Sequence, residues 1–466
     1  MSEAARQDYQ ARIPIYPRSV KGRFRNLKWW ILGLAYGVYF LLPWLRWERA
    51  VGPDQAVLFD IEGRRFYLFD LVVHPQDIFW LAGLLVIAAL LLFFVTAVAG
   101  RVFCGYFCFQ TLWTDVFVLV ERLVQGERPA RIRLDRQPWG LEKLRKKGLT
   151  HLLWLGVALL TGLSFTLYWG NAPQLIRDMA LGQAPFPAYA TTLFLTATTY
   201  VMAGFAREQV CTYMCPYSRF QSAMFDPDTL IVSYDEARGE GSQGRHKVTR
   251  GLKTREERQA AGVGDCIDCG YCVQVCPTGI DIRNGLQIQC IHCALCVDAC
   301  DNIMDSLGWP RGLIRYTSEN ALEGKPTHLV RPKTVGYAVA LVAVTGILVW
   351  SIATRAPLDA SVAQVRQPLF VQLSDGRIQN SYEIKLNNKT QHPVRLDIAL
   401  VGLDGAELDT GRIDTVTLDA EDSVRVMARV RYAPTDDRDR YDFQFRLIPR
   451  QQEMKPLQLE SHFFTP

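Results

Sequence analysis

Cysteine is missing from both ends of this 466-residue chain, and its charges nearly cancel. No cysteine follows Cys300, so the carboxyl-terminal region has no stabilising disulfide, and none precedes Cys104. The net charge of +5 gives no indication of a nucleic-acid partner. The motif C-x-x-C-H is absent, which argues against covalent attachment of a c-type haem. The polar amino terminus, MSEAARQDYQ, lacks the apolar stretch of a secretory signal peptide.

Eight of the twelve cysteines lie in one stretch, CIDCGYCVQVCPTGIDIRNGLQIQCIHCALCVDACD, which repeats the spacing C-x2-C-x2-C-x3-C. In ferredoxins with two [4Fe-4S] clusters, three cysteines of one copy bind one cluster and the fourth binds the other. A pair of zinc sites or a disulfide framework is the alternative, but zinc sites usually pair two C-x2-C units across a longer gap. The pattern therefore predicts a first cluster held by Cys266, Cys269, Cys272 and Cys300, and a second held by Cys290, Cys293, Cys296 and Cys276.

Apolar runs alternate with charged stretches along most of the chain. The clearest run, IFWLAGLLVIAALLLFFVTAVAG, carries no charge and is long enough to cross a membrane. Another, WWILGLAYGVYFLLPWL, has tryptophans near both ends, and tryptophans suit the membrane interface. The sequence predicts five membrane spans, at residues 29–45, 78–100, 149–169, 189–206 and 333–354.

The basic residues between these runs predict their orientation. Lys and Arg are concentrated in residues 1–28, in residues 101–148 and in the long insert 207–332, which places these segments in the cytoplasm. Iron–sulfur ligands need reduced thiolates, which also favours the cytoplasm for the insert. Residues 46–77 and 170–188 are expected outside. Part of the basic loop, LWTDVFVLVERL, has helical apolar spacing and is expected to lie at the membrane surface.

The last hundred or so residues have a different pattern. Short alternating runs such as SYEIKL and SVRVMARVRY are separated by turn signals such as SDG and LDG. This spacing, over residues 361–466, predicts an immunoglobulin-like β-sandwich, which we expect to dock or scaffold rather than catalyse. The predicted architecture is multi-domain: a basic cytoplasmic amino terminus (1–28), a four-span α-helical membrane domain (29–206), a cytoplasmic two-cluster ferredoxin-like insert (207–332), a fifth span (333–354) and a periplasmic immunoglobulin-like domain (355–466).

Three glycines satisfy the dinucleotide-binding pattern G-x-G-x-x-G, namely Gly239, Gly241 and Gly244. A Rossmann site needs an apolar helix directly after the glycines. The residues that follow, RHKVTRGLKTREERQ, are polar and basic. We therefore interpret this stretch as a loop without a nucleotide.

The four remaining cysteines form two C-x3-C pairs, each just after a predicted span. The pairs are Cys104 with Cys108 and Cys211 with Cys215. If each segment is helical, both thiols of a pair share one face, and two pairs at the same depth could converge into a four-thiolate site. Soft thiolates select Cu(I), zinc or iron–sulfur iron, and a redox-active metal is the more useful occupant beside an electron relay. The alternative is that all four are buried structural cysteines, which pack as small hydrophobes.

Three further side chains are weaker candidates for this chemistry. Met214 lies between Cys211 and Cys215 and is a candidate soft ligand, although packing explains it equally well. His246 is a candidate only because it shares the compartment. His292 lies inside the second cluster motif, so we expect it to tune the surroundings of that cluster rather than to bind metal.

Together these features resemble the cytochrome c oxidase accessory proteins called CcoG, FixG or RdxA. The matching stretches are FCGYFCFQTLWTD, VCTYMCPYSRFQSAMFD, YDEARGE and CPTGIDIRNGLQIQCIHCALCVDACD. The order of parts also matches, including an immunoglobulin-like tail after the last span, so the resemblance covers nearly the whole chain. One departure is GEGSQGRHK, where the family pattern has a proline, and it touches no proposed ligand.

The resemblance implies a role in assembling the high-affinity cbb3-type haem–copper oxidase in the bacterial inner membrane. It also implies a cytoplasmic reductase activity that converts Cu(II) to Cu(I) for copper chaperones or exporters. The four cysteines of the C-x3-C pairs are then the proposed copper site, and the electron donor is unknown.

Two other functions fit parts of the sequence. The first is a membrane quinol dehydrogenase, as in related polyferredoxins of denitrification. The nitrous-oxide type of those proteins carries a large amino-terminal flavin domain that this sequence does not show, and the nitrate type lacks the sandwich tail. The second is a non-catalytic assembly scaffold whose clusters are structural or sense redox state.

Overall fold

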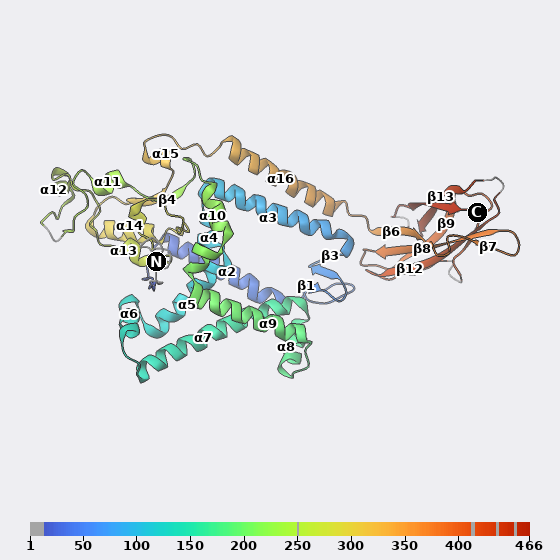
Figure 1. Cartoon of the computed structure of the whole chain (residues 1–466), viewed down its shortest axis with the longest axis horizontal. Coiled ribbons are helices and arrows are strands. Elements are labelled where there is room, and N and C mark those ends of the chain that lie inside the picture. The colour runs from blue at the N-terminus through green and yellow to red at the C-terminus, as the bar shows by residue number, and fades with distance from the viewer. Residues whose placement is uncertain (1–13, 249–250, 412–414, 435–437, 452–453) are drawn as a thin grey trace, which may run out of the picture. The chain divides into compact units, whose positions relative to one another are not determined.

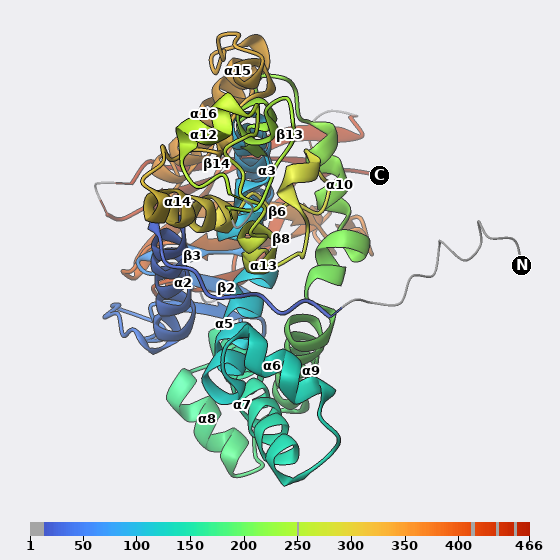
Figure 2. The ribbon, with the colours of Figure 1, turned by 90° about the vertical axis from the view of Figure 1, so that its left-hand side faces the viewer.

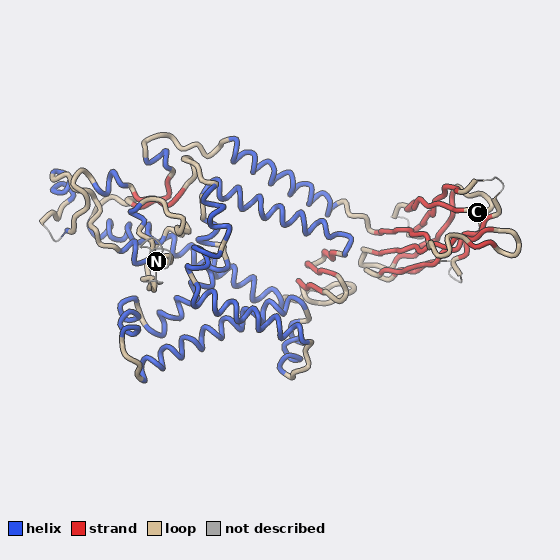
Figure 3. The backbone as a smooth tube through the Cα atoms, viewed as in Figure 1, coloured by secondary structure: helices blue, strands red, loops and turns tan. Residues whose placement is uncertain are grey.

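The computed structural model describes residues 14–248, 251–411, 415–434, 438–451 and 454–466. The chain forms two compact units. One contains Met1–Leu45, Val57–Arg65 and His74–Leu348, and the other contains Arg46–Ala56, Phe66–Val73 and Val349–Pro466. Helices make up most of the first unit and strands most of the second (Figure 3).

Four helical segments in the described residues are long and apolar enough to cross a membrane. They are Pro75–Ala99, Val102–Gln125, Leu141–Trp169 and Pro332–Ala353. Three of them coincide with expected spans, at 78–100, 149–169 and 333–354. The sequence is therefore that of a membrane protein, with apolar helices long enough to span a bilayer.

The other two expected spans do not reach this threshold. Residues 29–45 overlap helix α2 (Arg23–Leu41), whose first turns carry charged side chains. Residues 189–206 overlap helix α9 (Phe186–Thr199), which continues as a π-helical turn from Tyr200 to Ala206. The five-span topology and its orientation therefore stay predictions.

The segment Val102–Gln125 differs from the expected surface helix. It consists of α4 (Val102–Tyr106) and α5 (Phe109–Gln125). Asp115 of α5 is buried but lies 2.9 Å from Lys28 Nζ and 3.3 Å from an Arg25 guanidinium nitrogen. Both cations come from α2, and a buried charge persists when it is paired in this way. The sequence pattern could not reveal a pairing between residues so far apart in the chain.

Close packing between helices explains the threonine-rich composition near residue 190. Helix α7 (Leu141–Thr166) packs along α9, and a Cβ at Gly162 would lie only 2.5 Å from the Thr192 carbonyl oxygen. The hydroxyls of Thr166 and Thr192 share a 2.8 Å hydrogen bond. Small residues and hydroxyls of this kind allow helices to approach closely in membranes. The remaining helices of this part are α3 (Ile78–Ala99), α6 (Arg128–Arg136), α8 (Ala172–Ala180) and α16 (Pro332–Ala353), of which α16 runs alongside α3 (Figure 1).

The cysteine-rich insert folds around a two-stranded antiparallel sheet. Strand β4 (Ile231–Tyr234) pairs with β5 (Ile314–Thr317), with Val232 opposite Tyr316. Buried apolar side chains, among them Met304 and Leu313, pack around the cysteines. The helices of this region are α10 (Pro216–Ala223), α11 (Glu236–Glu240), α12 (Arg255–Ala260), α13 (Tyr271–Val275), α14 (Leu295–Leu307) and α15 (Glu319–Leu322).

The basic amino-terminal segment binds to the insert. Residues 1–13 lie outside the described part, but the Arg18 backbone N–H donates to the Gln274 carbonyl at 2.8 Å, and the segment crosses beside α13 (Figure 2). The Tyr271 hydroxyl donates to the Ser19 carbonyl at 3.1 Å. Asp298, between two cysteines of the second motif, accepts from the backbone N–H groups that begin α2. The segment therefore ties the cysteine-rich insert to a long helix instead of forming a free tail.

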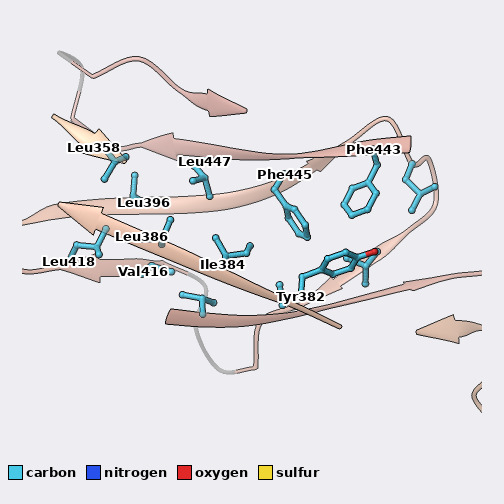
Figure 4. Close-up of a cluster of buried hydrophobic side chains, with 14 of the residues drawn as sticks. Leu358, Tyr382, Ile384, Leu386, Leu396, Val416, Leu418, Phe443, Phe445 and Leu447 are labelled. Atoms are coloured by element: carbon cyan, nitrogen blue, oxygen red, sulfur yellow. The ribbon is translucent and has the colours of Figure 1, made fainter. Parts of the chain in front are cut away.

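The carboxyl-terminal strands form the expected immunoglobulin-like sandwich. One sheet has the order β10-β12-β8-β6, with β7 also pairing with β8, and the other has the order β11-β9-β13-β14. Alternate residues point inward, and the buried rings and aliphatic side chains fill the space between the sheets (Figure 4). The strands are β6 (Leu358–Gln364), β7 (Val371–Gln372), β8 (Ile378–Asn388), β9 (Val394–Val401), β10 (Glu407–Asp409), β11 (Val416–Leu418), β12 (Ser423–Tyr432), β13 (Arg440–Pro449) and β14 (Leu457–Phe464). Three short strands precede α3, namely β1 (Val57–Asp60), β2 (Arg65–Leu68) and β3 (Leu71–Val73), of which β2 and β3 form a hairpin.

Replacing Phe445 tests how strongly buried rings stabilise this core, which has no disulfide. Its ring is fully buried and meets Tyr382 and Phe443 edge-on, with centroid separations of 5.3 and 5.0 Å. Phe445→Ala is expected to destabilise the sandwich by about 3–5 kcal/mol, the usual cost of deleting a buried ring. Limited proteolysis of the full chain measures this as faster cleavage of the sandwich. Met427→Ala, at a half-exposed position on β12, is the matched control and should leave the cleavage rate unchanged.

Candidate electron-transfer site

The first cysteine set lines one apolar cavity. Cys266, Cys269 and Cys272 reach it from the segment that leads into α13, and Cys300 reaches it from the middle of α14. Apolar side chains such as Met304 and Leu313 complete the wall. These four cysteines are the ones that the spacing groups together.

The second set lines a neighbouring cavity. Cys290, Cys293 and Cys296 reach it from the start of α14, and Cys276 reaches it from the end of α13. Cys272 lines both cavities. The two sites are therefore adjacent, and α13 and α14 connect them.

The two loops share an unusual backbone conformation. Asp268 and Gly270 have φ values of 49° and 62° around Cys269, and His292 and Ala294 have 50° and 58° around Cys293. Left-handed backbone is costly for Asp, His and Ala and persists only where the surroundings enforce it. Its repetition at equivalent positions indicates a loop shaped around a bound group. From the sequence, only Gly270 would suggest left-handed backbone at these four positions.

The donor chemistry of both cavities fits a metal cluster. Burial raises the pKa of Cys272 and of Cys290 to about 12, and burial also raises the pKa of Cys296 and of Cys300. Such thiols become thiolates only beside a strong positive charge, which bound iron supplies. Within the described residues, no group of three or more His, Cys, Asp or Glu side chains is close enough to hold a single metal ion. A cubane cluster separates its four thiolates more widely than one ion does, so the cavities fit a cluster better than zinc.

The C-x3-C spacing would place both thiols of a pair on one face of a helix if each segment were helical. Neither pair, however, lies on one continuous helix. Cys104 lies in α4, but the helix ends at Tyr106 and Cys108 is the extended residue that begins α5. Cys211 lies in a π-helical turn, and Cys215 is the extended residue that begins α10. Pro216 follows Cys215 and disfavours helical backbone there. One cysteine of each pair thus lies at a helix amino terminus, where the helix dipole favours negative charge.

The structure nevertheless brings the two pairs together. Cys104 Sγ donates to Gln221 Oε1 of α10 at 3.1 Å. Burial raises the pKa of Cys211 to about 12, and negative charge on Cys108, Cys104 and Cys215 raises it further. The four thiols are therefore close enough to interact electrostatically. They do not form a preshaped site for a single ion.

The weaker candidates lie apart from these thiols or have other partners. Met214 is 60% exposed, which does not suit a ligand directed into the site. His246 Nε2 pairs with the Gln243 carbonyl at 3.2 Å. His292 is buried, and its Nδ1 accepts a hydrogen bond from the Arg101 backbone N–H at 3.0 Å. Arg101 and Gln221 could not be identified from the sequence, because a backbone donor and a neutral amide leave no recognisable motif.

Two cysteine-lined cavities, apolar helices able to cross a membrane and an immunoglobulin-like sandwich define a class, the membrane-bound iron–sulfur proteins. The chain matches three family descriptions that agree with this class. They are a 4Fe-4S dicluster domain over residues 206–319, a 4Fe-4S binding domain over residues 81–125, and the immunoglobulin-like fold at the C-terminus of FixG over residues 348–466. The resident cofactors are therefore iron–sulfur clusters.

Three relatives identify the family more closely. The chain is 48% identical to protein RdxB of Cereibacter sphaeroides, over 82% of this chain and 80% of that protein. It is 47% identical to protein RdxA of the same organism, over 85% and 84% of the two chains. It is 42% identical to the nitrogen fixation protein FixG of Rhizobium meliloti, over 86% and 81%. The chain belongs to the FixG/RdxA family, which confirms the resemblance found in its sequence.

Proposed function

We propose that this protein transfers single electrons across the two cysteine-lined sites to a thiolate-held metal ion, with Cu(II) as the substrate and Cu(I) as the product. The observation that carries the proposal is the meeting of the two C-x3-C pairs beside the second cysteine set, where Cys104 packs in the same buried cluster as Cys293. Thiolates are soft donors that prefer Cu(I), so they favour the reduced product. Each turnover consumes one electron from an external one-electron donor.

We assign the cluster ligands from the two cavities and the spacing together. Bound [4Fe-4S] clusters supply one-electron redox chemistry. The chain supplies thiolate ligands, an apolar wall that keeps water away, and strained loops that hold the thiols in position. The first cluster is assigned to Cys266, Cys269, Cys272 and Cys300, and the second to Cys276, Cys290, Cys293 and Cys296.

Membership of the FixG/RdxA family supports a role in assembling a cbb3-type oxidase, with a copper chaperone or exporter receiving Cu(I). The arrangement we propose is a bacterial inner-membrane protein with five spans. Its amino terminus and ferredoxin-like insert lie in the cytoplasm, and its sandwich domain lies in the periplasm. The basic loops support this orientation.

Iron is the competing occupant of the C-x3-C site. The 4Fe-4S binding domain that matches residues 81–125 contains only Cys104 and Cys108 among the twelve cysteines. Metal analysis separates the two occupants. Two clusters require about eight iron atoms per chain. Iron beyond that, lost when the C-x3-C cysteines are replaced, would assign iron to this site instead of copper.

The proposal predicts stoichiometric copper reduction by the purified protein. Protein reduced anaerobically and freed of excess reductant is expected to convert about two Cu(II) ions per chain, one for each one-electron cluster, measured with a chromophoric Cu(I) chelator. The same protein with oxidised clusters controls for reduction by free thiols. Reduced clusters that yield no Cu(I) would overturn the proposal, and cluster reduction by a quinol would then favour a quinol dehydrogenase.

A further inference from the structure

Helix α4, which carries Cys104, lies directly against the backbone of the second cysteine loop. A Cβ at Gly105 would lie 2.7 Å from the Ile291 carbonyl oxygen and 3.0 Å from Cys293 Cα. No side chain larger than hydrogen therefore fits at residue 105 without displacing one of the two segments. Beside it, the buried Tyr106 hydroxyl donates to the Cys293 carbonyl at 3.1 Å.

The same loop is held from a second direction. His292 accepts the Arg101 backbone N–H at its Nδ1, which leaves its proton on Nε2. A Cβ at Gly100 would lie 2.6 Å from this Nδ1 atom, and Gly100 itself has a φ of +57°. The His292 ring also stacks on Phe225, with centroids 5.5 Å apart. Residues 100–106 and 291–293 thus form one close contact, which we call the α4 junction.

The first cysteine set lacks an equivalent cover. Among the twelve cysteines only Cys269 is exposed. A Cβ at the adjacent Gly270 would meet no atom within 4 Å. The sites are therefore ordered from the exposed Cys269, through the shared Cys272, to the second set, and then through the α4 junction to Cys104.

We propose that the α4 junction is the exit through which electrons pass from the second cysteine set to the C-x3-C thiols, and that the first set receives them. This inference rests on the proposed function. Electron tunnelling slows steeply with distance. At Gly105 the backbone of the helix that carries Cys104 lies directly against the backbone of Cys293, and the Tyr106 hydroxyl bonds the same loop. In each passage a low-potential one-electron donor is oxidised and one Cu(II) is reduced to Cu(I). No atom is transferred.

Gly105→Ala tests the junction, because the added methyl must separate α4 from the second loop. Transfer from the reduced clusters to Cu(II), followed by stopped flow, is expected to be slower than in the wild type, because the electron must cross a wider gap. The electron paramagnetic resonance signal and midpoint potential of the second cluster should change, while those of the first should not. Gly156→Ala in α7, where a Cβ would meet no atom within 4 Å, is the matched control and should behave as wild type.

A second variant and a second probe keep the proposal testable if Gly105→Ala does not fold. Tyr106→Phe keeps the packing but removes the hydrogen bond to the Cys293 carbonyl, and it should shift the potential of the second cluster alone. The second probe is a soluble dysprosium chelate. It should shorten the spin relaxation time of the first cluster more than that of the second.

The outcomes separate this inference from the function on which it rests. Wild-type protein that passes no electron to Cu(II) would contradict the proposed function. If the wild-type protein passes electrons to Cu(II) and the Gly105→Ala variant does so equally fast, the α4 junction is not the exit. The proposed function would still stand. Stronger relaxation of the second cluster by the chelate would reverse the order of the two sites.

Discussion

Replacing Cys104, Cys108, Cys211 and Cys215 together with serine is expected to abolish Cu(II) reduction while both cluster signals persist. Serine is nearly isosteric with cysteine, but its hydroxyl stays protonated at neutral pH and is a hard donor that Cu(I) does not favour. None of the four lines the two cluster cavities. The assay is the anaerobic Cu(I)-chelator measurement on protein with reduced clusters, and the loss should be complete within detection.

Met214 provides the matched control for this variant. It is the sulfur-bearing side chain between Cys211 and Cys215, but it is 60% exposed. Met214→Leu should therefore reduce copper at the wild-type rate. If the fourfold serine variant reduces copper at the wild-type rate, the proposed copper site is wrong and the four cysteines are packing residues. A loss of both cluster signals in that variant would instead show that these thiols support the fold of the insert.

The sequence pattern predicts local features of this protein well, because these depend on spacing. The repeat around Cys266–Cys300 groups Cys300 with the first three cysteines and Cys276 with the later three, as the cavity linings do, although Cys272 lines both cavities. Alternation in the last hundred residues predicts the sandwich, and it is correct because the long strands β8, β12 and β13 bury every second side chain over most of their length. The apolar runs at 78–100, 149–169 and 333–354 are also found as helices able to cross a membrane.

The features that the sequence could not predict depend on contacts between distant segments. The sequence predicts a surface helix at LWTDVFVLVERL, but α5 buries Asp115 and Glu121 against cations of α2, α6 and the turn at Arg207, and no local pattern reveals these pairs. The C-x3-C pairs converge although neither forms a continuous helix, since Gln221 of α10 reaches Cys104 of α4. The role of Gly105 is invisible in the sequence, because only the fold shows which backbone lies against it.

Cys276→Ala and Cys300→Ala are expected to remove opposite clusters. Cys276 follows the first motif copy but lines the second cavity, and Cys300 ends the second copy but lines the first cavity. Loss of one thiolate from a four-thiolate cluster should lower the iron content from about eight to about four atoms per chain in each variant. Iron analysis measures this loss, and the spin-relaxation probe identifies the surviving cluster.

The exposure of Cys269 gives the two variants different signatures. Cys276→Ala should retain the first cluster, whose signal relaxes quickly with a soluble dysprosium chelate because Cys269 is exposed. Cys300→Ala should retain the second cluster, which α4 covers, so its relaxation should respond less. Each variant serves as the control for the other, because each removes the half-buried fourth cysteine of one motif copy. The opposite pairing of signatures would mean that each motif copy supplies all four ligands of its own cluster, and the crossed assignment would be wrong.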